Sequence, residues 1–148
     1  MQLTGFTVLV VEDDVDNLEL LISHLEQEGA LVLGAESVSA ALRLASEHTV
    51  DALLCDLELP DGDGCGVLQK LRERPGSSDL PAIALTGYSD AGWRKAANDC
   101  GFARYAVKPF SLQELTAWLA EIIDRQSGLR AMTSHALPEV AARDPRRR

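Results

Sequence analysis

The chain has 148 residues, of which 46% are hydrophobic and 25% charged, values typical of a single soluble globular domain. Its net charge is −9, and four of its arginines lie among the last six residues, so the remainder is more acidic still. An acidic body repels a phosphate backbone, which argues against direct binding of nucleic acid. The sequence contains no run of 18 apolar residues and no basic, apolar leader, so it predicts neither a membrane span nor a signal peptide.

The three cysteines are Cys55, Cys65 and Cys100. Their odd number and the lack of a CxxC pair exclude a disulfide-rich scaffold. Together with the composition and the missing leader, this cysteine usage predicts a protein of the reducing cytoplasm.

Five short and nearly continuous apolar runs are typical of strands that are buried on both faces of a parallel sheet. They cover residues 6–11, 31–35, 52–55, 82–85 and 103–107. Helical periodicity fills the intervals at 18–25, 38–45 and 67–71, less regularly at 90–100, and again at 111–122. The last pattern starts with Ser111 followed by Glu114, which is the signature of a capping box.

This alternation predicts an α/β fold: a (βα)5 three-layer sandwich around a five-stranded parallel sheet. Fold statistics favour the strand order 2-1-3-4-5, with ligands at the carboxyl ends of the strands. We expect residues 1–126 to form this domain. Residues 127–148 contain glycine, prolines and the terminal arginines, and are expected to form a flexible C-terminal tail without an effector domain.

Chemically useful side chains follow four of the five predicted strands. Asp13 and Asp14 follow the first strand, Asp56 the third, Thr86 the fourth and Lys108 the fifth. Crowded carboxylates repel one another unless a cation bridges them, and an all-oxygen ligand set favours Mg²⁺. An aspartate can attack phosphorus, and Mg²⁺ with a lysine ammonium can neutralise the phosphoryl oxygens. A simpler alternative is that the first acidic residues start a helix and complement its dipole.

The sequence resembles the receiver domain of two-component response regulators, which has a flavodoxin-like fold of the CheY type. The resemblance covers about residues 5–126. The matching motifs are VLVVEDD at 8–14, Asp56 with PDGDG at 60–64, ALTGY at 84–88 and YAVKPF at 105–110. Each motif alone is weak evidence for the resemblance, but the four motifs together in this order are strong evidence.

The resemblance implies a role for each matching position. Asp56 is similar to the phospho-acceptor of the family, and Asp13 and Asp14 to the acidic pair that holds Mg²⁺. The backbone carbonyl of Glu58 is expected to be a further ligand of the metal. Lys108 is similar to the lysine that binds the phosphoryl group, and its bond to the following proline resembles the cis peptide of the family.

Four positions are implied to control the switch and its lifetime. Thr86 is similar to the switch hydroxyl and Tyr105 to the switch aromatic that turns inward on activation. The side chains of Glu58 and Tyr88 lie where the family tunes the attack of water on the acyl phosphate, and we expect Tyr88 to shield it.

The implied function is a signalling phospho-acceptor that takes a phosphoryl group from the phospho-histidine of a sensor kinase or of a phosphotransfer protein. The chain would not be an enzyme for an external substrate, because it would catalyse only its own phosphorylation and dephosphorylation. The implied readout face comprises the fourth helix, fifth strand and fifth helix, where a downstream protein or a second copy would bind. Two alternatives stay open: a degenerate receiver that acts as an interaction module without phosphorylation, and a phosphohydrolase with an aspartate nucleophile.

Overall fold

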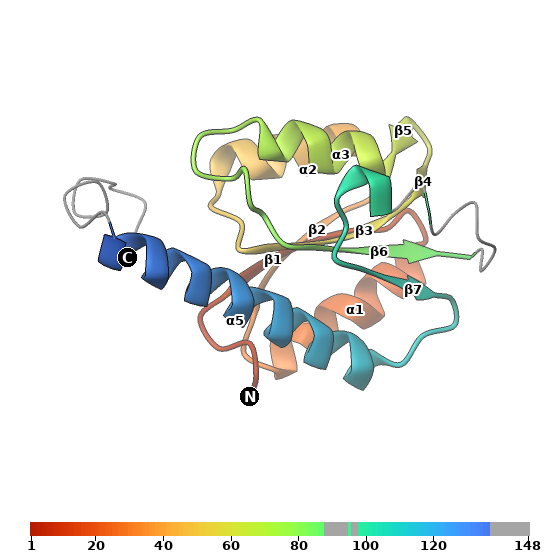
Figure 1. Cartoon of the computed structure of the whole chain (residues 1–148). Helices are drawn as coiled ribbons and strands as arrows, with labels where there is room; N and C mark the ends of the chain where they lie inside the picture. The colour runs from red at the N-terminus through yellow and green to blue at the C-terminus, as the bar shows by residue number, and fades with distance from the viewer. Residues whose placement is uncertain (88–94, 96–97, 137–148) are drawn as a thin grey trace.

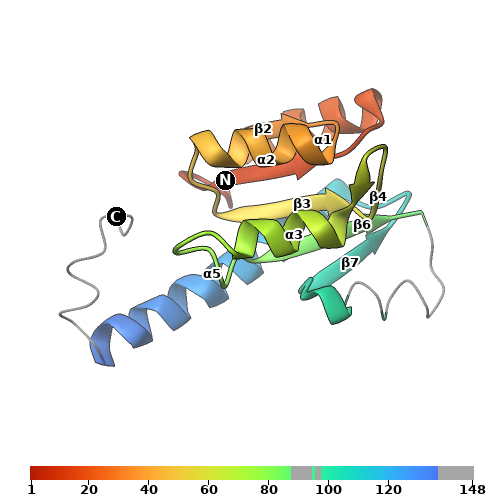
Figure 2. The same cartoon turned by 90° about the horizontal axis from the view of Figure 1, so that it is seen from above.

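The structure, a computed structural model, describes residues 1–87, 95 and 98–136, with side chains as far as residue 126. Its core is a five-stranded parallel sheet in the order β2-β1-β3-β6-β7 (Figure 2). The strands are β1 (Thr7–Val11), β2 (Leu31–Ala35), β3 (Ala52–Asp56), β6 (Ala82–Thr86) and β7 (Arg104–Val107). Numbered along the chain, these five strands have the order 2-1-3-4-5, which confirms the predicted topology.

Helices cover both faces of the sheet and give the three layers that the sequence predicts (Figure 1). The helices are α1 (Val15–Gln27), α2 (Val38–Glu47), α3 (Gly64–Arg72) and α5 (Leu112–Ala136). Helices α1 and α5 pack on one face, and α2 and α3 pack on the other. The fold is therefore the predicted (βα)5 sandwich.

Every residue of β3 and β6 is buried, because these central strands contact a helical layer on each side. Along β3, Leu54 packs into the core beneath α1 and α5, whereas Leu53 and Cys55 pack into the core beneath α2 and α3. Complete burial of one such leucine stabilises the fold by about 1.5–3 kcal/mol. This two-sided burial explains why the strands appear in the sequence as continuous apolar runs.

Side-chain caps fix where the helices begin. Asp14 accepts from the amide of Asn17 at 3.1 Å and caps α1. Ser111 accepts from the amide of Glu114 at 3.2 Å, as the capping-box pattern predicts. The cap positions determine which acidic residues are available to the functional site.

Three features differ from the expected elements or extend them. The chain between β3 and α3 contains a small antiparallel hairpin of β4 (Glu58–Leu59) and β5 (Gly62–Asp63). The helix expected at 90–100 lies mostly outside the described residues, although Lys95 and residues 98–100 are helical. Helix α5 continues to Ala136, ten residues beyond the predicted domain boundary at 126, and the boundary itself stays a prediction.

A disulfide joins Cys65, in the first turn of α3, to Cys100, which lies at the end of the helical stretch 98–100. The Cα atoms are 5.4 Å apart, within the range that a disulfide can span, and the two residues are 35 positions apart in sequence. The fold thus pairs two cysteines whose spacing gives no sign of it. Within the described part of the chain, no helix combines the length and the apolar character needed to cross a membrane.

Candidate functional site

The candidate site lies where the carboxyl ends of β1, β3, β6 and β7 meet at one edge of the sheet. Asp56 ends β3 and Thr86 ends β6, while Glu12 and Lys108 each follow directly after a strand. The register pairs Asp56 with Leu85 and Thr86 with Val107, so these chain ends are level with one another. The parallel sheet therefore brings together residues that are up to 96 positions apart.

Asp56 is held by one interaction on each carboxylate oxygen. Its Oδ1 accepts from the amide of Glu58 at 3.1 Å, and its Oδ2 accepts from Nζ of Lys108 at 2.8 Å. The residue is 7% exposed, so the carboxylate reaches the surface while most of it is covered. Such a carboxylate is oriented by the protein and still open to a small reactant.

Glu12 is the most deeply buried charged group of the site, with no exposed surface. Its Oε2 accepts from the amide of Asp14 at 3.2 Å, and its Oε1 lies 2.7 Å from Nζ of Lys108 in an ion pair. Burial raises the pKa of Glu12, and the nearby charge of Asp56 adds to this, while Lys108 and the Asp14 amide act in the opposite direction. The ionised form of Glu12 is therefore favoured only when a cation lies next to it.

Lys108 supplies positive charge to both carboxylates. Its backbone amide donates to the carbonyl of Thr86 at 2.7 Å, and its side chain is 25% exposed. Burial alone would lower the pKa of Lys108, but the contacts with Asp56 and Glu12 outweigh it and raise the pKa above its usual 10.5. The Lys108–Pro109 peptide is cis, as the resemblance implies.

A divalent cation fits next to this ion pair. Oxygen atoms of Glu12, Asp13 and Asp56 lie within 4.8 Å of one another, and no other group of this kind occurs among the described residues. Oε1 of Glu12 is buried, and the ammonium of Lys108 lies 2.7 Å from it. An all-carboxylate set suits a hard ion such as Mg²⁺.

The acidic group differs by one residue from the predicted pair of Asp13 and Asp14. The structure brings Glu12 and Asp13 to Asp56, whereas Asp14 accepts from the amide of Asn17 as the cap of α1. Asp14 therefore has the helix-start role that was the simpler alternative for these acidic residues. Sequence reasoning missed Glu12 as a site residue, although its position directly after the first apolar run was a usable signal.

The remaining candidates take different positions around the site. Thr86 is 3% exposed and ends β6 beside the cluster. Glu58 is exposed and contributes its amide to Asp56. Tyr105 is half-buried on β7 and packs against the core beneath α2 and α3, while Tyr88 lies outside the described residues.

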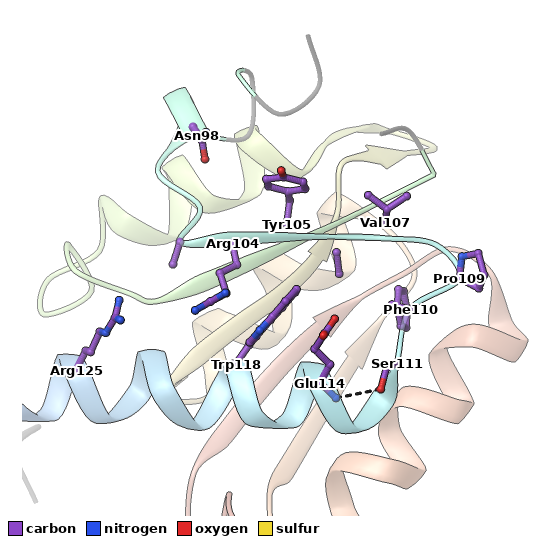
Figure 3. A pocket seen from close by; sticks show the side chains of 12 residues that line it. Asn98, Arg104, Tyr105, Val107, Pro109, Phe110, Ser111, Glu114, Trp118 and Arg125 are labelled. Carbon is purple, nitrogen blue, oxygen red and sulfur yellow. Dashed lines mark hydrogen bonds between the residues drawn. The ribbon is translucent and has the colours of Figure 1, made fainter. Parts of the chain in front are cut away.

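An open groove runs along β7 and α5 on the face that the resemblance implies for readout (Figure 3). The guanidinium of Arg104 lies over the ring of Trp118, 4.9 Å from its centroid, and donates to Glu121 at 2.9 Å. Figure 3 shows Tyr105 on the opposite side of β7 from Arg104 and Trp118. Arg104 therefore faces α5, whereas its neighbour Tyr105 faces the side of the sheet that α3 covers.

The comparisons with known proteins agree with this geometry. The response regulator receiver domain family matches residues 8–120. A 14.6 kDa protein of the sodA1 3′ region of Leptolyngbya boryana is 40% identical over 113 residues, which are 76% of this chain and 86% of that protein. The Escherichia coli KDP operon transcriptional regulatory protein KdpE is 36% identical over 124 residues, or 84% of this chain and 54% of KdpE.

The chain also matches solved structures, including the non-phosphorylated HemR receiver domain of Leptospira biflexa. That match has a TM-score of 0.72 and 33% identity, and covers 80% of this chain and 94% of the HemR domain. The chain belongs to the response regulator receiver family. It spans about half the length of KdpE and of the other curated transcriptional regulators that it matches.

Receiver domains are the signalling phospho-acceptors of two-component systems, and they catalyse the loss of their own phosphoryl group. They interact with histidine kinases and with downstream effectors, and they typically bind Mg²⁺. The acidic group of Glu12, Asp13 and Asp56 fits such an ion.

A thermal-unfolding comparison separates the two versions of the acidic pair. We expect Mg²⁺ to stabilise the chain by about 2–3 kcal/mol when the ion is at roughly a hundred times its Kd. Glu12→Gln and Asp13→Asn should each remove this stabilisation, because each deletes a charged ligand. Asp14→Asn is the matched control: it should retain the full response, because asparagine also caps helices well. Loss of the response in Asp14→Asn with a normal response in Glu12→Gln would restore the pair suggested by the sequence.

Proposed function

We propose that Asp56 accepts a phosphoryl group from the phospho-histidine of a sensor kinase or phosphotransfer protein in a Mg²⁺-dependent step. The observation that carries this proposal is the Asp56 carboxylate, which is partly open to solvent, fixed by the Glu58 amide and paired with Lys108 at 2.8 Å. The proposed receiver comprises residues 1–126.

In the proposed step, a carboxylate oxygen of Asp56 attacks phosphorus as the bond from phosphorus to the imidazole nitrogen breaks. The bonding electron pair leaves with the imidazole, and the product is an aspartyl phosphate. Lys108 neutralises charge on the phosphoryl oxygens, and its place beside Oδ2 of Asp56 needs little rearrangement for this. Glu12, Asp13, Asp56 and the carbonyl of Glu58 would hold Mg²⁺, which supplies further counter-charge to the phosphoryl group.

The proposed output is a shift between two conformations. Thr86 would bond a phosphoryl oxygen with its hydroxyl, and Tyr105 would turn inward at the same time. Their positions support this, because Thr86 ends the strand next to β3 and Tyr105 lies on the neighbouring strand β7. A downstream protein would read the face of the fourth helix, β7 and α5, with a homodimer through that face as the alternative. We place the protein in the cytoplasm, with no direct contact to nucleic acid or membrane.

Two other functions have less support. A receiver that works only as an interaction module would not need the complete set of acidic residues, Thr86 and Lys108 at one sheet edge. A phosphohydrolase of the haloacid-dehalogenase type would carry its nucleophile in a DxDx(T/V) motif after the first strand. The sequence there reads Glu12, Asp13 and Asp14, and the candidate nucleophile ends β3 instead.

Intact mass after incubation with a small phosphodonor tests the proposed acceptor. We expect one base-labile phosphoryl adduct that requires Mg²⁺ and is absent from Asp56→Asn, because the amide is a far weaker nucleophile than the carboxylate. Asp61→Asn is a matched control on the exposed hairpin turn and should be phosphorylated normally. An unmodified mass in the folded chain with Mg²⁺ present would favour the interaction module, and turnover of external phosphomonoesters would favour the hydrolase.

The lifetime of the proposed aspartyl phosphate is expected to depend on Tyr88 and Glu58. We propose that Tyr88 shields the phosphoryl group from water and that Glu58 adds negative charge nearby. Tyr88→Ala should shorten the half-life several-fold, as measured by the decay of the adduct after removal of the phosphodonor. Tyr88→Phe, which keeps the ring, should decay like the unmodified chain; equal half-lives for Tyr88→Ala and the unmodified chain would contradict the shielding role.

A further inference from the structure

The Cys65–Cys100 disulfide connects the start of α3, which is next to the proposed acceptor, with the chain that leads into β7. Cys65 follows Gly64 at the start of α3, and Cys100 precedes Gly101 and β7. Both cysteines are half-buried and pack against the core beneath α2 and α3. The bond lies on the side of the sheet that α2 and α3 cover.

The start of α3 is packed directly on the proposed acceptor strand. The amide of Gly64 donates to the carbonyl of Leu57 at 3.0 Å. A Cβ atom at Gly64 would approach the carbonyl oxygen of Asp56 to 2.5 Å, so only glycine fits here. A displacement of Cys65 therefore acts on Gly64, the next residue, which is in close contact with the backbone of Asp56.

The other end of the disulfide leads into the strand that carries Tyr105 and ends next to Lys108. Cys100 is followed by Gly101, whose φ of +100° favours glycine, and by the buried Phe102. β7 begins at Arg104 and pairs with β6 up to Thr86. The disulfide thus links the acceptor side of the site to the strand with the proposed switch aromatic.

A second contact between the same parts does not depend on the cysteines. At the far end of α3, the guanidinium of Arg72 donates twice to the carbonyl of Leu80, which precedes β6, at 2.7 and 3.2 Å. The same guanidinium lies beside Gly101, close to where a Cβ atom would sit. Reduction of the disulfide would therefore leave this contact between α3 and the chain before β7 in place.

We propose that Cys65 and Cys100 are a reversible thiol–disulfide pair that controls the phosphorylation switch, an inference that rests on the proposed function. In a cytoplasmic protein such a bond is usually transient and redox-sensing. The proposed oxidant is a low-molecular-weight disulfide. One cysteine thiolate attacks it, forms a mixed disulfide and releases one thiol. The second cysteine thiolate then attacks the mixed disulfide and releases the second thiol.

The third cysteine is a poor candidate for this exchange. Cys55 is completely buried in β3, and its Sγ lies against the carbonyl of Asp56 at 3.2 Å. Burial raises its pKa well above the usual value, and the charge of Asp56 adds to this, so little thiolate is present. The redox change is therefore confined to Cys65 and Cys100.

The disulfide should favour the resting conformation. In the proposed switch, movement of Thr86 and Tyr105 would displace β6 and β7 relative to α3, and a covalent link across that boundary would restrict the displacement. A constraint that fits one conformation better than another shifts the population toward it. The oxidised chain should consequently accept a phosphoryl group roughly 3–10-fold more slowly than the reduced chain.

The test uses the full chain, equilibrated with graded ratios of reduced to oxidised glutathione. Alkylation under denaturing conditions followed by intact mass should give three alkyl groups for the reduced chain and one for the oxidised chain. Phosphorylation by a small phosphodonor with Mg²⁺ is then timed in both states. In every buffer, Cys65→Ser and Cys100→Ser should each accept the phosphoryl group as fast as the reduced, disulfide-free chain does. Cys55→Ala should retain the full redox response.

Each outcome decides the proposal. Slower phosphorylation of the oxidised chain, absent from Cys65→Ser and Cys100→Ser, would support it. Three alkyl groups at every glutathione ratio, or equal rates in both redox states, would overturn it while leaving Asp56 as acceptor. Absence of phosphorylation in both states would instead overturn the proposed function, and the redox control of it as well.

Discussion

The site depends on one buried ion pair arrangement: the ammonium of Lys108 lies between the carboxylates of Glu12 and Asp56, at 2.7 and 2.8 Å. Without this cation, two acidic groups would face each other at low exposure, where their repulsion is poorly screened. The raised pKa of Lys108 means that folding favours its charged form. While its carboxylate partners are ionised, its stabilising contribution is thus fully present below about pH 10.5, and it is lost as the pH rises through the folded-state pKa.

The fold supplies the positions that this arrangement needs. Glu12, Asp56 and Lys108 follow or end three strands of one parallel sheet, and the strands are fixed by cores on both faces. The backbone amide of Lys108 donates a hydrogen bond to the Thr86 carbonyl, so the lysine also contacts the strand that carries the proposed switch hydroxyl. A change in charge at Asp56, such as phosphorylation, would therefore act directly on the end of β7 and on the groove beside α5.

Much of this could be predicted from the sequence, because burial on both faces leaves a continuous apolar run for each strand. The strand order came from fold statistics rather than from any residue. The structure brings Glu12 and Asp13 to Asp56, one position before the predicted pair of Asp13 and Asp14, because β1 ends at Val11 and Asp14 caps α1. The Cys65–Cys100 pairing was missed because only the packing of α3 beside the chain before β7 brings these residues together.

The most direct test of the ion pair is the free energy of unfolding of Lys108→Met as a function of pH, without and with Mg²⁺. Burial raises the pKa of Glu12 above its usual 4.5, and removal of Lys108 takes away a contact that lowers it. We predict that the variant is nearly as stable as the unmodified chain near pH 4. The deficit should grow to about 3 kcal/mol as the pH rises through the pKa of Glu12, because the ionised carboxylate is then buried without its cation. Mg²⁺ should recover part of this loss, whereas a deficit that is constant with pH and unaffected by Mg²⁺ would contradict the account.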